Sequence, residues 1–180
     1  DFDAGARLTY TIGERFTGRV QLVNGWQTIK EINNSPAFGM ANIYEIKKKM
    51  LINWGLFAGN EPYRGKDDQL KLYSNFFAQF HLKNLTLAPL FDYCMQKDTT
   101  TTDEYNSFYA YGMVARYKIS KKFALAARYE KMHDPDNIVA ELLPVTPHGF
   151  QMDGYTFTIE HLPSEYVTLR LESRYFKTID

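Results

Sequence analysis

Residues 1–12, DFDAGARLTYTI, alternate between apolar and polar side chains without a break. Phe2, Leu8 and Tyr10 fall on one side of an extended chain, whereas Arg7 and Thr9 fall on the other. Successive side chains of a β-strand point to opposite faces, whereas a helix would scatter both sets around its axis. This stretch therefore predicts a strand with one apolar face and one polar face.

The same period of two recurs along the whole chain of 180 residues. Further strands are predicted at residues 16–22, 38–47, 50–59, 70–82, 85–96, 109–118, 123–130, 155–160 and 167–175. Pro89 cannot donate a hydrogen bond to a neighbouring strand, so the strand at 85–96 is expected to hold a bulge or to lie at a sheet edge. The expected fold class is all-β, an antiparallel up-and-down meander of about ten strands without a helix.

The connections between the predicted strands alternate in length. The short ones are residues 13–15, 47–49, 83–84, 120–122 and 162–165, and the long ones are roughly 27–37, 61–69, 97–104 and 134–148. Aromatic residues next to the short turns are Tyr10, Phe16, Tyr44, Phe80, Tyr117, Phe123 and Tyr166. A second aromatic group lies toward the long connections and comprises Phe2, Trp26, Phe38, Tyr105, Tyr129, Tyr155 and Tyr175. Two aromatic girdles around an aliphatic band are typical of a transmembrane β-barrel.

The apolar face carries more aromatic rings than a soluble barrel of about ten strands could hold inside without a large cavity. The polar face mixes charged residues with small ones such as Gly5, Thr9, Ala124 and Thr156. This mixture suits a crowded, wet interior better than a water-exposed surface, where long charged side chains would be expected at nearly every position. We therefore expect the apolar face, with the seven aromatic residues beside the short turns, to contact lipid and the polar face to line a lumen.

The predicted lumen-lining residues are Arg7, Arg19, Asp92, Arg116, Arg128, Glu130, Glu160, Arg170, Glu172 and Arg174. Charges removed from bulk water have to be paired, and cross-strand neighbours of opposite sign stabilise a sheet. We interpret most of these residues as paired, structural charges. The other interpretation is a selectivity lining, in which a slightly basic lumen would favour anions.

The composition excludes several other classes of protein. The chain has 21 basic and 21 acidic residues, so its net charge gives no reason to expect nucleic-acid binding. Hydrophobic residues make up 44 %, which excludes intrinsic disorder. The mean hydropathy is -0.41, and no stretch approaches the ~20 apolar residues that a membrane helix needs. Cys94 is the single cysteine, so no disulfide can form within the chain.

No motif for catalysis or for metal or cofactor binding stands out. The histidines lack metal-ligand spacing, and neither a phosphate-binding loop nor a Gly-x-Ser-x-Gly motif is present. Ser107 and His133 fall near the same rim as a candidate lipase-like pair, but no third residue is placed to orient them. We therefore expect neither enzymatic activity nor a cofactor.

Several short motifs carry a resemblance to a known family. They are Val23-Asn24-Gly25-Trp26-Gln27, Gly59-Asn60-Glu61, Arg128-Tyr129-Glu130 followed by Asp134-Pro135, and Thr146-Pro147-His148-Gly149-Phe150-Gln151. In their order and spacing, the chain resembles the OmpL-like putative β-barrel porins of bacterial outer membranes. The resemblance implies an outer-membrane location, contact with outer-membrane lipid, passive passage of small hydrophilic solutes, and no catalytic residues.

Strand parity predicts that residues 1–180 form a single β-barrel segment, an internal part of a larger barrel that lacks strands at both ends. The first predicted strand runs into a short turn and the last one leaves a short turn, so both ends would lie on the outer side. Bacterial barrels have even strand numbers, so about twelve or more strands are expected in total. Two alternatives remain open: a soluble antiparallel barrel that binds an apolar ligand inside, and a closed outer-membrane barrel with a structural or docking role.

Overall fold

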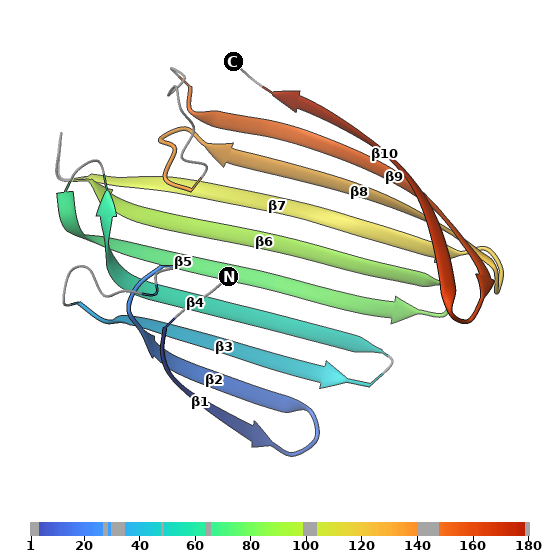
Figure 1. The fold of residues 1–180 in the computed structure, drawn as a ribbon, viewed down its shortest axis with the longest axis horizontal. Helices are drawn as coiled ribbons and strands as arrows, with labels where there is room; N and C mark the ends of the chain where they lie inside the picture. Colours follow the sequence, from blue (N-terminus) through green and yellow to red (C-terminus); the bar gives the residue numbers. More distant parts are fainter. Residues whose placement is uncertain are drawn as a thin grey trace.

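The computed structural model describes residues 4–26, 29, 35–47, 49–63, 66–98, 104–139 and 148–178. Its ten strands are β1 (Gly5–Ile12), β2 (Phe16–Val23), β3 (Ala37–Ile46), β4 (Met50–Tyr63), β5 (Lys66–Leu82), β6 (Leu85–Asp98), β7 (Glu104–Lys118), β8 (Phe123–Asp134), β9 (Phe150–Ser164) and β10 (Val167–Thr178). They form one antiparallel sheet whose strand order follows the chain (Figure 1). The predicted all-β meander is therefore confirmed.

The sheet is curved but does not close on itself (Figure 1). Within the described residues, β1 pairs only with β2 and β10 pairs only with β9. The short turns lie together at one end of the sheet, and β1 begins and β10 finishes at the opposite end, where the long connections lie (Figure 1). No helix in the described part of the chain is long and apolar enough to cross a membrane.

The strand register divides the side chains into two faces. One row of partners crosses all ten strands and consists of Thr9, Arg19, Ala41, Gly55, Asn75, Asp92, Ala110, Met132, Met152 and Thr178. Side chains of successive residues in a strand point to opposite faces. We call the face that contains this row, and every second residue from it, the polar face. The residues between them form the apolar face.

Burial on the two faces is the reverse of that in a water-soluble sheet. Along β9, Thr156, Thr158 and Glu160 on the polar face are buried, whereas Tyr155 and Phe157 on the apolar face are 50 % and 48 % exposed. Most of the exposed large hydrophobic residues in other strands, such as Leu8, Trp54, Phe91 and Leu171, also lie on the apolar face. An antiparallel sheet with one face in water would bury its hydrophobic face and expose its polar one.

Apolar packing on the polar face involves chain segments that leave the strands. Trp26, which follows β2, packs against the buried cluster of Val23, Ala37 and Phe57. Ile138, which follows β8, is 3 % exposed and packs against Cys94 and Phe108. These two segments therefore fold back onto the polar face at the end of the sheet where the long connections lie.

The prediction of a long loop at residues 61–69 is wrong. β4 continues to Tyr63 and β5 begins at Lys66, with Glu61 paired to Gln69. Pro62 and the polar run after it are typical of a loop, but backbone pairing depends on N–H and C=O groups and tolerates polar side chains. A register shift between Glu61 and Tyr63 accommodates Pro62.

The prediction of a bulge or an edge at Pro89 is also wrong. β6 lies inside the sheet between β5 and β7. The pairs Phe77–Leu90 and Phe80–Leu87 keep a single register on both sides of Pro89, so no residue is inserted. Pairing with β5 is instead interrupted between those two pairs. Pro89, which has no N–H, therefore lies where no hydrogen bond to β5 is required.

Parts of the sequence-based expectations concern residues outside the described ranges. Phe2, Gln27, Thr146 and Pro147 are among these residues. So are segments of the predicted long connections at 27–37, 97–104 and 134–148.

Candidate functional site

All ten predicted lumen residues lie on the polar face. Arg19 and Asp92 belong to the row that defines this face. Each of the others lies an even number of residues from a member of that row on its own strand: Arg7, Arg116, Arg128, Glu130, Glu160, Arg170, Glu172 and Arg174. The alternation read from the sequence therefore groups these ten residues on one face, and the structure adds which of them contact one another.

Three of these residues form one ionic cluster near the short-turn end of the sheet. Arg116 Nε donates to Glu160 Oε2 at 2.9 Å, and Arg170 Nε donates to Glu160 Oε1 at 3.2 Å. Arg116 comes from β7, so it reaches across β8 to bond with Glu160 in β9. Ala124, which is 1 % exposed and faces Glu160 in the register, is small enough to leave room for this contact.

Most of the remaining charges also have partners. Arg128 Nη2 lies 3.4 Å from Glu130 Oε1, and Arg174 Nη2 lies 3.2 Å from Glu172 Oε1. Asp92 accepts a hydrogen bond from the Asn75 side-chain amide on the adjacent strand. Eight of the ten predicted residues therefore have a charged or polar partner, as expected for charges that stabilise a sheet.

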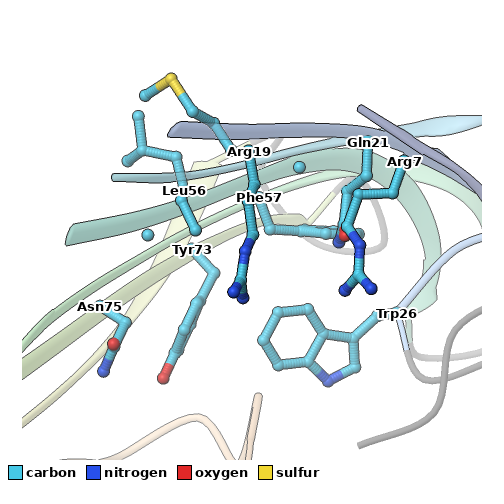
Figure 2. Close-up of a pocket in the computed structure, with 12 residues that line it drawn as sticks. Arg7, Arg19, Gln21, Trp26, Leu56, Phe57, Tyr73 and Asn75 are labelled. Atoms are coloured by element: carbon cyan, nitrogen blue, oxygen red, sulfur yellow. The ribbon is translucent and has the colours of Figure 1, made fainter. Parts of the chain in front are cut away.

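Arg7 and Arg19 are different, because no carboxylate in the described part of the chain forms an ion pair with either of them. Both line a cavity of about 280 Å³ on the polar face. The residues that line this cavity, by side chain or by backbone, are Arg7, Arg19, Gln21, Trp26, Gly39, Met40, Ala41, Gly55, Leu56, Phe57, Tyr73 and Asn75. Figure 2 shows the two guanidinium groups directed to the same side of the sheet as Tyr73 and Trp26, whereas Leu56 points to the other side.

Trp26 forms one wall of this cavity and is held by contacts with four residues. Its ring centroid lies 5.0 Å from that of Phe57 and 4.8 Å from that of Tyr73. Its backbone N–H donates to Glu61 Oε1 at 2.7 Å, and Lys71 Nζ lies 5.0 Å from the ring. The sequence-based placement of Trp26 in an outer aromatic girdle is therefore wrong, because Trp26 lies beyond the end of β2, where strand parity no longer determines the direction of a side chain.

The sequence around Arg7 and Arg19 holds a signal for this difference, namely the lack of acidic residues at the paired positions. Arg7 pairs with Gln21, and Arg19 pairs with Thr9 and Ala41. Gly39 and Gly55 follow one strand further, and none of these residues is acidic. Among the described residues, the register therefore places no carboxylate directly beside these two cations. Lys71 and Tyr73, which support Trp26, could not be assigned to the site without the fold.

The aromatic residues predicted beside the short turns lie where the apolar face meets those turns. Tyr44 is 36 % exposed and Tyr117 is 51 % exposed. Four others lie on the same face, namely Tyr10, Phe16, Phe80 and Phe123, and Tyr166 lies in the turn between β9 and β10.

A row of tyrosines lies nearer the long-connection end of the apolar face. Ring centroids are 6.2 Å apart for Tyr111 and Tyr129, 5.3 Å for Tyr129 and Tyr155, and 6.4 Å for Tyr155 and Tyr175. Just beyond this row, Asp153 accepts a hydrogen bond from the Tyr129 hydroxyl at 2.9 Å. The hydrophobic band of the apolar face therefore ends in amphipathic residues at both edges.

Catalytic and metal-binding arrangements are not found among the described residues. His133 stacks on Tyr109, with ring centroids 4.8 Å apart, and no hydrogen bond joins it to Ser107 in that part of the chain. No group of three or more His, Cys, Asp or Glu side chains there is arranged to hold a metal ion.

Known proteins were compared with the chain by sequence and by fold. The family model described as "Putative beta-barrel porin-2, OmpL-like" matches residues 2–180. The outer membrane channel DcaP of Acinetobacter baumannii shares the fold, with a TM-score of 0.74 at 13 % sequence identity. That match covers 97 % of this chain and 56 % of the DcaP chain, so this chain spans little more than half of the channel's length. No curated protein matches the chain. Because the family model extends over nearly every residue, the chain belongs to the family of OmpL-like putative β-barrel porins.

Proposed function

We propose that this chain forms the wall of a porin that lets small hydrophilic solutes diffuse passively through a membrane. The observation that carries the proposal is the reversed burial of the two faces. Soluble monomers rarely expose a continuous apolar patch of more than a few hundred Å², yet the apolar face exposes large side chains on nearly every strand. Contact with hydrocarbon removes the free-energy cost of that exposure.

The family and the shared channel fold indicate the bacterial outer membrane as the location. In this membrane, the aromatic residues at the short-turn end, such as Tyr10, Tyr44 and Tyr117, would lie at the lipid–water boundary. Rings with one polar edge favour that boundary. The polar face, with its paired charges, would line the lumen.

We further propose that residues 1–180 form one continuous wall segment of a barrel with more than ten strands. The edges of β1 and β10 are unpaired within the described residues. An unpaired strand edge inside hydrocarbon leaves backbone N–H and C=O groups unsatisfied, so a membrane barrel has to close. A closed barrel of about eight strands is filled by side chains, whereas 16–18 strands leave an aqueous channel.

The proposed role is passage without catalysis. Ionic contacts such as the Glu160 cluster hold the polar face in place, and no cofactor is required for diffusion. A soluble barrel that binds an apolar ligand would need the two faces exchanged. Purification of the complete protein as a stable monomer without detergent would therefore support the soluble alternative and contradict a porin.

The test is the electrical conductance of the complete protein in planar lipid bilayers. We expect stepwise current increases in potassium chloride as single molecules insert, and swelling of liposomes that contain the protein when small sugars are added outside. A folded barrel that inserts but gives no stepwise current would contradict the porin and favour a structural or docking role.

A further inference from the structure

We propose that the cavity beside Arg7 and Arg19 is a binding subsite for a small organic anion that carries a carboxylate on a flat, apolar body. This inference rests on the proposed function, because it assigns a solute class to the lumen of the same pore. Three independent features support it: guanidinium groups that lack a carboxylate partner among the described residues, an aromatic wall, and a floor of small residues.

The charge of the cavity is the first feature. Elsewhere on the polar face, arginines contact a carboxylate, as Arg116 and Arg170 contact Glu160 and Arg174 contacts Glu172. Arg7 and Arg19 lack such a partner in the described residues, and no acidic side chain lines their cavity. A guanidinium presents a planar fork of donors that matches the two oxygens of a carboxylate. The cavity therefore offers two free forks for an anionic group.

The aromatic wall is the second feature. Trp26 is fixed by Phe57, Tyr73 and the Glu61 carboxylate, so its ring is held in place before any ligand arrives. Lys71, which is 7 % exposed, lies over the Trp26 ring, and Glu61 accepts the backbone N–H of Trp26. These two charges are of opposite sign, so they add no net charge beside the ring. Fixed aromatic rings bind flat apolar groups by stacking or edge contacts. Arg7, Arg19 and Trp26 line the same cavity, and Figure 2 shows their side chains on the same side of the sheet, so one ligand could contact both kinds of group.

The shape of the floor is the third feature. Gly39, Ala41 and Gly55 line the cavity under the arginines. A Cβ atom added at Gly55 would lie 3.7 Å from the nearest protein atom, the Met40 carbonyl oxygen, so a small side chain can be placed there at ordinary contact distance. Cavities that hold drug-sized ligands measure about 300–1,000 Å³, so a cavity of about 280 Å³ fits a smaller molecule. A single ring with one carboxylate is of this size.

The experiment measures binding to the complete protein in detergent by isothermal titration calorimetry with benzoate, acetate and benzyl alcohol. We expect benzoate to bind more tightly than acetate, which lacks the ring, and than benzyl alcohol, which lacks the charge. R7Q and R19Q should each weaken benzoate binding about tenfold, since a hydrogen bond to a charged group is of that strength. W26L should weaken binding of benzoate but not of acetate.

Two further variants separate the site from a general effect of charge. G55A adds a methyl group to the floor at ordinary contact distance and removes no charge, so it should weaken benzoate binding. R174Q removes an arginine of the same face that is already paired with Glu172. It should therefore leave benzoate binding unchanged. Retention of heat-modifiable migration in electrophoresis shows that each variant is folded.

The outcomes distinguish this inference from the proposed function. Equal binding of benzoate and acetate, or equal effects of R7Q and R174Q, would overturn the subsite even if the protein conducts ions in bilayers. An absence of conductance would overturn the porin, whereas the titrations in detergent would still decide whether the anion subsite exists.

Discussion

At the scale of single residues, Glu160 shows how one carboxylate can organise a polar wall. It is 6 % exposed and bonds to arginines from two different strands, Arg116 in β7 and Arg170 in β10. A buried charge is tolerated only when its partners satisfy it, and loss of one member leaves the others uncompensated. Glu160 is therefore expected to contribute more to stability than its exposed counterpart Glu172.

The substitution Glu160→Gln tests this expectation. Gln has nearly the same shape but no charge, so Arg116 would lose its counter-ion, and we expect about 1–3 kcal/mol of destabilisation. The matched control is Glu172→Gln, whose partner Arg174 is 42 % exposed, so its effect should stay below about 1 kcal/mol. Urea unfolding of the complete protein in lipid vesicles, followed by tryptophan fluorescence, measures both. Equal losses would contradict a special role for Glu160.

At the scale of structural elements, the segment that follows β8 is held on the polar face mainly by the side chain of Asp134, beside one bond from the Tyr63 hydroxyl to the Asp136 carbonyl. Asp134 Oδ1 accepts the Ile138 N–H at 2.8 Å, and Oδ2 accepts the Val139 N–H at 2.9 Å. These two bonds turn the chain back so that Ile138 is buried against Cys94 and Phe108. Asp134 therefore keeps this segment against the polar face, where the segment takes up part of the space above the sheet.

Replacement of Asp134 by Ala is expected to release this segment while the strands stay paired. Loss of hydrogen bonds to a charged group should increase hydrogen exchange at the Ile138 and Val139 amides about tenfold or more. Ser120 offers a control, because its Oγ accepts the N–H groups of Lys122 and Phe123 at 3.1 Å in an exposed turn. Ser120→Ala should therefore change exchange only locally. Unchanged exchange at Ile138 in D134A would show that packing and the Tyr63 hydrogen bond are enough to hold the segment.

The elements also show how far the sequence determines the fold. Side-chain alternation predicts which residues form strands and which face they share, because both follow from the geometry of an extended chain. It does not predict the direction of Trp26, which lies beyond the end of β2, or the contact of Arg116 with Glu160, which reaches across an intervening strand. Such contacts depend on the curvature of the sheet and on small residues such as Ala124, so they require the assembled structure.

At the scale of the whole molecule, the exposed apolar face and the buried polar face determine the solvent in which the fold is stable. In water, hydrophobic burial supplies most of the driving force for folding, and that force would favour exchanging the two faces. In a bilayer, the apolar face is already in a favourable environment. Backbone hydrogen bonds between strands then hold the wall together, since none can be made to hydrocarbon.

A charge placed in the middle of the apolar face tests whether this face contacts lipid or water. Ala127 is exposed there, between the rows of Tyr129 and Phe123, and pairs with Ala115 and Phe157. If the face contacts lipid, Ala127→Arg should destabilise the complete protein in vesicles by about 2–4 kcal/mol, because arginine has to be desolvated at the midplane. Glu165→Arg, in the exposed turn before β10, should change stability by less than about 0.5 kcal/mol. An equally small effect at Ala127 would mean that this face contacts water, because an exposed alanine in water accepts arginine without penalty.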